Sequence, residues 1–165
     1  MAYVDMVSGK CHVFQTMKTC FLFGHSDASQ RIYPSLLESV DRHIERFGVS
    51  EFIVGHYGMF DTLTTAAVKE AKGRHKNVRL TMLLSYHPGR HDAFVLPEGF
   101  DGSVFPFDKP VPPRLAIIKA NEAMIDRSDY LICYVAHFGK AQDFLEYAQR
   151  RKKKGLIHIC NIAII

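Results

Sequence analysis

Five apolar runs alternate with helical patterns along most of this chain, and the alternation limits the folds that it can adopt. The apolar runs span about 19–23, 51–54, 78–85, 130–135 and 156–162. Between them, apolar residues at helical spacing predict amphipathic helices. These helices span about 32–47, 61–73, 112–125 and 141–153. Apolar strands joined by amphipathic helices are typical of an α/β fold, in which a parallel sheet is covered on both faces.

The handedness of crossover connections favours one strand order for such a chain. Right-handed βαβ units predict a doubly wound, mostly parallel five-stranded Rossmann-like sheet in the order 3-2-1-4-5. In that order the first and fourth strands are neighbours at the switch point, where ligand sites of these folds lie. The stretch over 86–111 is rich in proline and glycine, so we expect an irregular loop at the same edge of the sheet.

The length of 165 residues suits one domain with a single core. Residues 1–17 have no clear period, so we predict an N-terminal extension over 1–17 and a single domain over 18–165. No apolar stretch approaches the roughly 20 residues that span a bilayer, and no signal-peptide pattern opens the chain. The four cysteines are scattered, which predicts reduced thiols rather than a disulfide framework. We therefore expect a cytoplasmic protein without membrane association.

Three of the predicted strands end in glycine-containing turns. The first strand leads into Gly24-His25-Ser26-Asp27 and the second into Gly55-His56-Tyr57-Gly58, ahead of Asp61. The fourth leads into His137-Phe138-Gly139-Lys140. Glycine lets a phosphate approach backbone amides, and the helix N-terminus behind each turn adds partial positive charge. Because these turns are expected at one sheet edge, they predict a ligand site.

Arg114 is a further candidate for that site. It lies in the first turn of the third predicted helix, where the helix dipole does not favour a cation, so we expect an anionic ligand or a structural carboxylate as its partner. The predicted ligand-binding residues are Gly24, His25, Ser26, Asp27, Gly55, His56, Tyr57, Gly58, Asp61, Arg114, His137, Gly139 and Lys140.

The chemistry of these turns leaves alternatives open. Asp61 is most simply the N-cap of the second helix, and Asp27 is either a turn residue or an acceptor for a ribose hydroxyl. The histidines and carboxylates could hold a metal, but none has a recognised metal-ligand spacing, so no metal is predicted. The standard dinucleotide and P-loop glycine motifs are absent. No catalytic set is complete, and Asp143 and Asp27 are the candidate acid–base residues.

The net charge of +4 comes largely from one run, Arg150 to Lys154. Cations at the end of a helix complement its dipole, so a solvated helix end is the simplest interpretation. The alternative is a phosphate or nucleic-acid contact. No aromatic residue interleaves the run, so a nucleic-acid partner is not favoured.

Together these motifs resemble those of small bacterial proteins in the SLOG superfamily. These are Rossmann-like domains related to cytokinin-activating nucleotide phosphoribohydrolases and to the DNA-processing protein fold. The resemblance covers about Lys18 to Ile162. It rests on Phe23-Gly24-His25, on Val54 to Asp61, on Val111-Pro112-Pro113-Arg114 with Asn121, and on Ser128-Asp129-Tyr130 leading into Tyr134 to His137. It implies a nucleotide or nucleotide-derived ligand at the strand ends.

One departure from that family bears on function. The phosphoribohydrolases carry P-G-G-x-G-T-x-x-E after the fourth strand, whereas Ala136 to Asp143 lacks the double glycine, the Gly-Thr and the Glu. The resemblance therefore implies binding rather than hydrolysis, and we predict a sensor or sequestering module. The alternatives are a nucleoside-phosphate N-glycosidic hydrolase and a DNA-associated domain. A homodimer through the third helix or the C-terminal tail is also left open.

Overall fold

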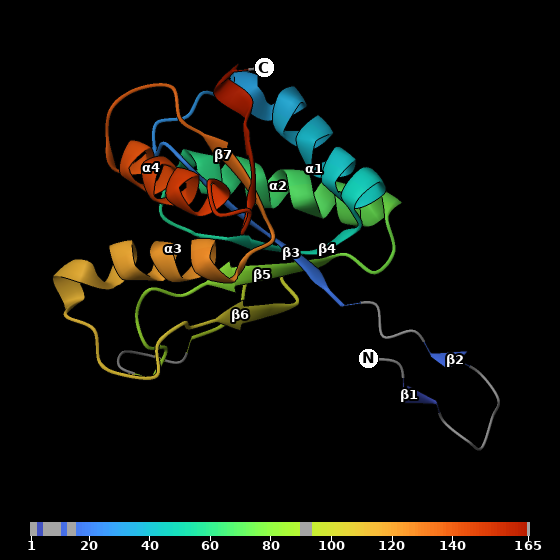
Figure 1. The fold of residues 1–165 in the computed structure, drawn as a ribbon, viewed down its shortest axis with the longest axis horizontal. Helices are drawn as coiled ribbons and strands as arrows, with labels where there is room; N and C mark the ends of the chain where they lie inside the picture. The colour runs from blue at the N-terminus through green and yellow to red at the C-terminus, as the bar shows by residue number, and fades with distance from the viewer. Residues whose placement is uncertain (1–2, 5–10, 13–15, 90–93, 165) are drawn as a thin grey trace.

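A computed structural model describes residues 3–4, 11–12, 16–89 and 94–164 of the chain. Six strands form one parallel sheet. They are β3 (Lys18–Gly24), β4 (Val49–Val54), β5 (Arg79–Leu83), β6 (Gly102–Val104), β7 (Tyr130–Tyr134) and β8 (His158–Asn161). Their order is β6-β5-β4-β3-β7-β8 (Figure 1), which places β3 between β4 and β7. The expected α/β fold with a parallel sheet is confirmed.

The strand count and the strand order both differ from the prediction, because β6 adds a sixth strand at the edge beside β5. This strand lies within 86–111, where we expected an irregular loop. Asp101 stabilises the edge, since its carboxylate accepts a hydrogen bond from Leu80 N–H at 2.8 Å and pairs with Lys72. A strand of three residues is too short for an alternating pattern to reveal it.

Two helices cover each face of the sheet. They are α1 (Tyr33–Phe47), α2 (Met59–Arg74), α3 (Ala116–Arg127) and α4 (Lys140–Lys152). Helices α1 and α2 pack on the face that carries Leu22 and Val54, and α3 and α4 pack on the face that carries Phe21 and Ile53 (Figure 1). Neighbouring residues of one strand thus enter different cores, which is why the strands read as continuous apolar runs.

Two helices begin at other residues than expected. Helix α2 starts at Met59 with Gly58 as its N-cap, so the prediction that Asp61 is the N-cap is wrong. Asp61 instead lies in the first turn, where its Oδ2 accepts a hydrogen bond from Tyr57 N–H at 2.9 Å. Arg114 lies in a short 3-10 helix, η2 (Pro113–Leu115), directly ahead of α3.

The ends of the chain add small elements. Tyr3–Val4 (β1) pairs antiparallel with Cys11–His12 (β2), and a 3-10 turn over Ile162–Ile164 follows β8. The other residues of 1–15 lie outside the described part of the chain, so the predicted extension is largely untested. Cys20, Cys133 and Cys160 are free thiols.

Each helix in the described part of the chain is too short or too polar to cross a lipid bilayer.

Candidate ligand site at the strand ends

The turns after β3, β4 and β7 surround a cavity of about 480 Å³, which we call the strand-end cavity. Because β3 lies between β4 and β7, the carboxyl ends of these three strands meet. Among the predicted ligand-binding residues, the cavity is lined by Gly24, His25, Ser26, Asp27, Gly55, Tyr57, Gly58, Asp61, His137, Gly139 and Lys140. The fold thus gathers side chains and backbone from three separate parts of the sequence.

The turns after β3 and β4 touch through glycine. Met59 N–H donates to the carbonyl of Ser26 at 2.9 Å, and a Cβ added to Gly58 would lie 2.7 Å from Ser26 Cα. A Cβ on Gly24 would lie 2.6 Å from the ring of Phe60. Any side chain at these two positions would push the turns apart, so glycine keeps this wall of the cavity closed.

His25 joins the turn after β3 to the turn after β7. Its buried ring accepts two hydrogen bonds at Nε2, from Ala136 N–H at 3.1 Å and from His137 N–H at 3.2 Å. An imidazole that accepts at Nε2 carries its proton on Nδ1 and is neutral. Burial, and after it the charge of His137, lowers the pKa of His25, which agrees with a neutral ring.

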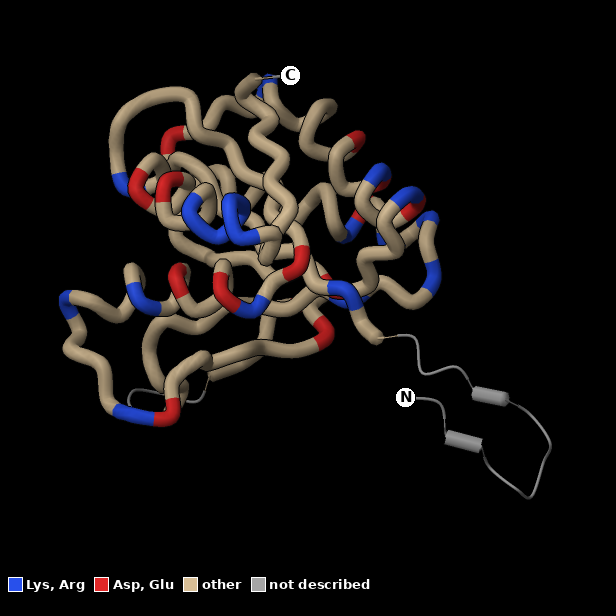
Figure 2. The backbone as a smooth tube through the Cα atoms, in the orientation of Figure 1, with Lys and Arg blue, Asp and Glu red and all other residues tan. Residues whose placement is uncertain are grey.

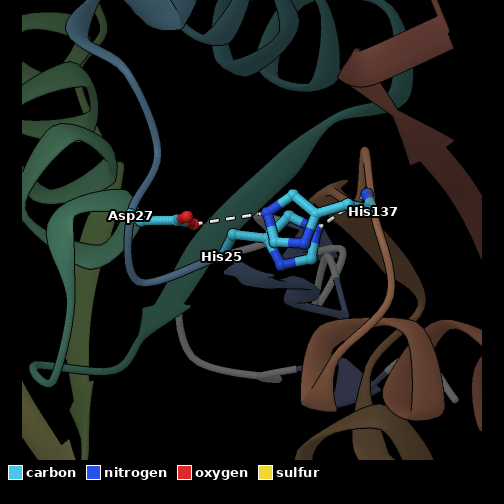
Figure 3. Close-up of side chains that lie close together, drawn as sticks. All are labelled: His25, Asp27 and His137. Carbon is cyan, nitrogen blue, oxygen red and sulfur yellow. Dashed lines mark hydrogen bonds and ion pairs between the residues drawn. The ribbon is translucent and has the colours of Figure 1, made fainter.

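His137 lies flat on His25 with ring centroids 3.6 Å apart and an interplanar angle of 9° (Figure 3). Its Nδ1–H donates to the carbonyl of Phe138 at 2.9 Å, and its Nε2 lies 3.4 Å from the carboxylate of Asp27. Both ring nitrogens therefore face acceptors, which favours the protonated form. The Phe138 carbonyl first, and then Asp27, raises the pKa of His137.

The same three side chains form the one cluster among the described residues whose composition suits a metal ion. Ligand atoms of His25, Asp27 and His137 all lie within 4.8 Å of one another. Two stacked parallel rings cannot aim their in-plane lone pairs at a single ion, and Nε2 of His25 already accepts two backbone N–H groups. A metal would require the turn to rearrange, so the arrangement fits an imidazole stack better than a metal centre.

Asp61 is the half-buried acid of the site. Its carboxylate occupies the space next to Gly55, where an added Cβ would lie 2.9 Å from Oδ2. Burial raises the pKa of Asp61, and the N–H groups of Tyr57 and Gly58 oppose that rise. Asp27, in contrast, is an exposed acid at the rim, with 72% of its side-chain surface accessible.

The N-termini of α2 and α4 both open onto the strand-end cavity. Their N-cap residues, Gly58 and Gly139, line it, and neither helix has a side-chain cap. Gly139 has φ +146°, a region that other residues rarely adopt. Each helix has an acid in its first turn, but Asp61 of α2 lines the strand-end cavity and Asp143 of α4 does not, and α4 begins with Lys140, which lines it. The N-terminus of α4 with Lys140 is therefore the better position for an anion.

Three predicted residues lie away from the strand-end cavity. His56 is exposed and packs its ring against Tyr57, with centroids 4.1 Å apart. Arg114 is exposed in η2. Asp143 lines another cavity of about 270 Å³ between α3 and α4, which also has Glu122 in its lining and shares Lys140 and Phe144 with the strand-end cavity. Of the two candidate acid–base residues, Asp27 alone lines the strand-end cavity.

The cavity also has polar residues that the sequence analysis did not select. Ser85 lines it because β5 ends at Leu83, whereas the apolar run predicted a strand through Ser85. Asn121 reaches it from α3, and its Nδ2–H donates to the carbonyl of Ile117 at 2.8 Å. Asn121 could have been selected from the sequence, because it belongs to the SLOG-like pattern. No sequence pattern marks Ser85 as a cavity residue.

The basic run at the end of α4 is partly engaged within the protein. Arg151 pairs with Asp126 at 3.1 Å, and the guanidinium of Arg150 lies over the ring of Tyr147 at 5.5 Å. Lys and Arg are interspersed with Asp and Glu rather than gathered on one side of the view in Figure 2. These contacts hold Arg150 and Arg151 against neighbouring residues of the protein.

A comparison with protein-family models and with curated proteins finds no match for this chain. The SLOG resemblance therefore stays a prediction. A fold of this class hosts many unrelated functions, so the case for function rests on the strand-end cavity itself.

Proposed function

We propose that this protein binds a nucleotide or nucleotide-derived small molecule in the strand-end cavity, as a sensor or sequestering module. One observation carries the proposal: three strand-to-helix turns converge on a single cavity, and two of them present uncapped helix N-termini to it. Ligands of doubly wound sheets bind in such crevices. The volume of about 480 Å³ falls within the range of small-molecule sites.

A phosphate fits best at the N-terminus of α4. The helix dipole and the ammonium group of Lys140 both attract an anion there, and the backbone at Gly139 has no side chain in the way. Asp27 and Asp61 are acceptors suited to sugar hydroxyls rather than to phosphate. We assign His25 a positioning role, because its Nε2 is already committed to the β7–α4 turn.

Thermal shift tests the proposal with AMP, GMP, CMP, UMP and the corresponding nucleosides at millimolar concentration. A ligand at one hundred times its Kd stabilises the folded state by about 2.7 kcal/mol, which raises Tm by roughly 5–10 °C for a chain of this size. Lys140→Glu should abolish the rise, and Lys154→Glu, just beyond the other end of α4, should not. A flat panel in the wild-type protein would refute the proposal.

The charge reversal at Lys140 is chosen so that a lost response reflects binding. A glutamate at the start of a helix is favoured by the dipole, so Lys140→Glu should fold at least as well as the wild type. Isothermal titration with the responding nucleotide then gives the loss of affinity directly.

N-glycosidic hydrolysis of nucleoside monophosphates is a second candidate, and Asp27 is the observation that favours it. Its carboxylate lies at the cavity rim beside His137, where it could serve as an acid or a base. Chromatography of the free base released from each nucleotide measures this activity. Asp27→Asn should abolish release, while Asp143→Asn should keep it because Asp143 lies in another cavity. No release by the wild-type protein would leave binding as the function.

A further inference from the structure

A second and larger cavity, of about 820 Å³, adjoins the strand-end cavity. The two share one lining residue, Ser85, which follows β5. The other described residues that line the larger cavity come from the segments before and after β6 and from the start of α3. We call it the aromatic cavity, because rings of Tyr86, His87, Phe94, Phe105 and Phe107 line it.

Three of the rings that line the aromatic cavity contact one another. Phe105 lies edge-on to Phe107 and to His87, with centroids 5.3 Å apart in both pairs. Tyr86 and Phe94 are 50% and 42% exposed, although large rings are normally buried. Such a lining offers faces and edges on which a flat ring can stack. Asp108 and Lys109 also line the aromatic cavity, but the N-termini of α2 and α4 open onto the strand-end cavity instead.

Ser85 marks the junction of the two cavities and lacks a partner there. The residue is 2% exposed, and its Oγ makes no hydrogen bond with any described residue. The Tyr57 hydroxyl lies nearby. Burial raises the pKa of Tyr57, and Ser85 opposes that rise, but the two hydroxyls do not meet the geometry of a hydrogen bond. A buried hydroxyl without a partner is costly, and a polar atom of a ligand would satisfy it.

We infer that the aromatic cavity is the subsite for the base of the bound nucleotide, with phosphate and ribose in the strand-end cavity and Ser85 pairing with a polar ligand atom at the junction. The inference rests on the proposed function and adds the division of the ligand between two cavities. It identifies the ligand as a nucleotide held by its base as well as by its phosphate, and not as a bare sugar phosphate.

Filling the aromatic cavity is the direct test. Val111→Trp adds a large ring to its lining, and Val95→Trp places the same ring on an exposed residue that does not line it. Titration calorimetry compares AMP, GMP, CMP and UMP with ribose 5-phosphate, which lacks a base. Val111→Trp should weaken nucleotide binding at least about tenfold and change ribose 5-phosphate binding less than about twofold, since stacking on aromatic rings contributes to the first alone.

The hydroxyl of Ser85 is tested by deletion. Ser85→Ala should weaken nucleotide binding by about five- to tenfold, the effect of one lost hydrogen bond, while Ser103→Ala on β6 should leave nucleotide binding unchanged. Lys109→Trp fills the same cavity from an exposed position and replaces Val111→Trp if that variant does not fold. Melting curves without ligand establish the folding of each variant.

The outcomes separate the inference from the proposed function. Nucleotide binding that resists both cavity-filling variants but is lost in Lys140→Glu would overturn the inference and retain the proposed function. Equal weakening of nucleotides and ribose 5-phosphate by Val111→Trp would also overturn it, since the base would then not be the affected part. No nucleotide binding by the wild-type protein would overturn both.

Discussion

At the scale of single residues, the two stacked histidines divide into a structural and a titrating member. His25 is buried and accepts two backbone N–H groups, so its neutral form holds the β7–α4 turn in place. His137 stacks on that ring and pairs through Nε2 with the carboxylate of Asp27, so its charged form is favoured. The pKa values of these two contacting imidazoles are therefore shifted in opposite directions, that of His25 down and that of His137 up.

NMR titration of the histidine ring protons checks this assignment. The pKa of His137 should lie above the ordinary value of about 6.5, and that of His25 below it. His137→Asn removes a neighbouring charge, so it should raise the pKa of His25. His158→Asn, in β8 and away from the pair, is the control and should leave that pKa unchanged. Equal pKa values for His25 and His137 would contradict the assignment.

The lowered pKa of His25 also has a consequence for stability. The unfolded chain takes up a proton near pH 6.5, while folded His25 resists protonation until lower pH. The contribution of neutral His25 to folding stability is therefore complete above about pH 6.5 and is lost as the pH falls toward the pKa of His25 in the folded protein. Buried His43 acts in the same direction, chiefly through burial. His137 acts in the opposite direction, because its charged form is favoured in the folded state.

At the scale of elements, the site depends on how closely the turns after β3 and β4 approach. The first residue of α2 donates its N–H to the carbonyl of Ser26, which fixes α2 against the β3 turn. The approach leaves no room for a Cβ on Gly58, because the neighbour is backbone rather than a flexible side chain. The chain at Gly58 is extended, so space and not backbone dihedrals requires glycine there.

Alanine substitution should change the free energy of unfolding in opposite directions at two glycines, the N-cap Gly58 and Gly73 within α2. Gly58→Ala should destabilise the fold by about 1–3 kcal/mol, since the added carbon overlaps Ser26. Gly73→Ala, in α2 with open space around it, should stabilise by about 0.5–1 kcal/mol through helix propensity. Urea unfolding followed by circular dichroism measures both. A loss of stability at Gly73 similar to that at Gly58 would show that the close contact is not the cause.

At the scale of the whole molecule, the sheet separates two cores that share no side chain. Leu36 of α1 is fully buried in the core under α1 and α2, and Met124 of α3 is buried in the core under α3 and α4. The strand-end cavity lies where the turns from both layers meet, since α2 and α4 begin on opposite faces.

Truncations in the two cores should be costly and additive. Leu36→Ala and Met124→Ala should each lower the free energy of unfolding by about 2–5 kcal/mol, because each leaves a cavity in a packed core. The double variant should equal the sum within about 0.5 kcal/mol, since the sites share no neighbours. Leu156→Ala, which is half exposed, is the control with a small effect. Strong non-additivity in urea unfolding would show that the two cores are coupled across the sheet.

The layer arrangement and the location of the candidate ligand site follow from local sequence. Continuous apolar runs such as that at Leu131 and Ile132 indicate strands buried on both faces, and helical spacing indicates the covering helices. Strand-to-helix turns that contain glycine are equally local, so the three walls of the strand-end cavity were predictable. The sixth strand was not, because β6 is defined by its partner β5 rather than by its own pattern.

Periodicity and the handedness of short connections predict the class of the fold and the sheet edge that carries the candidate ligand site. The contacts of each side chain there depend on the tertiary structure. His25 accepts hydrogen bonds from a turn 111 residues away, Asp143 lies in another cavity, and Ser85 joins two cavities. These roles depend on contacts between distant segments, which no local pattern records.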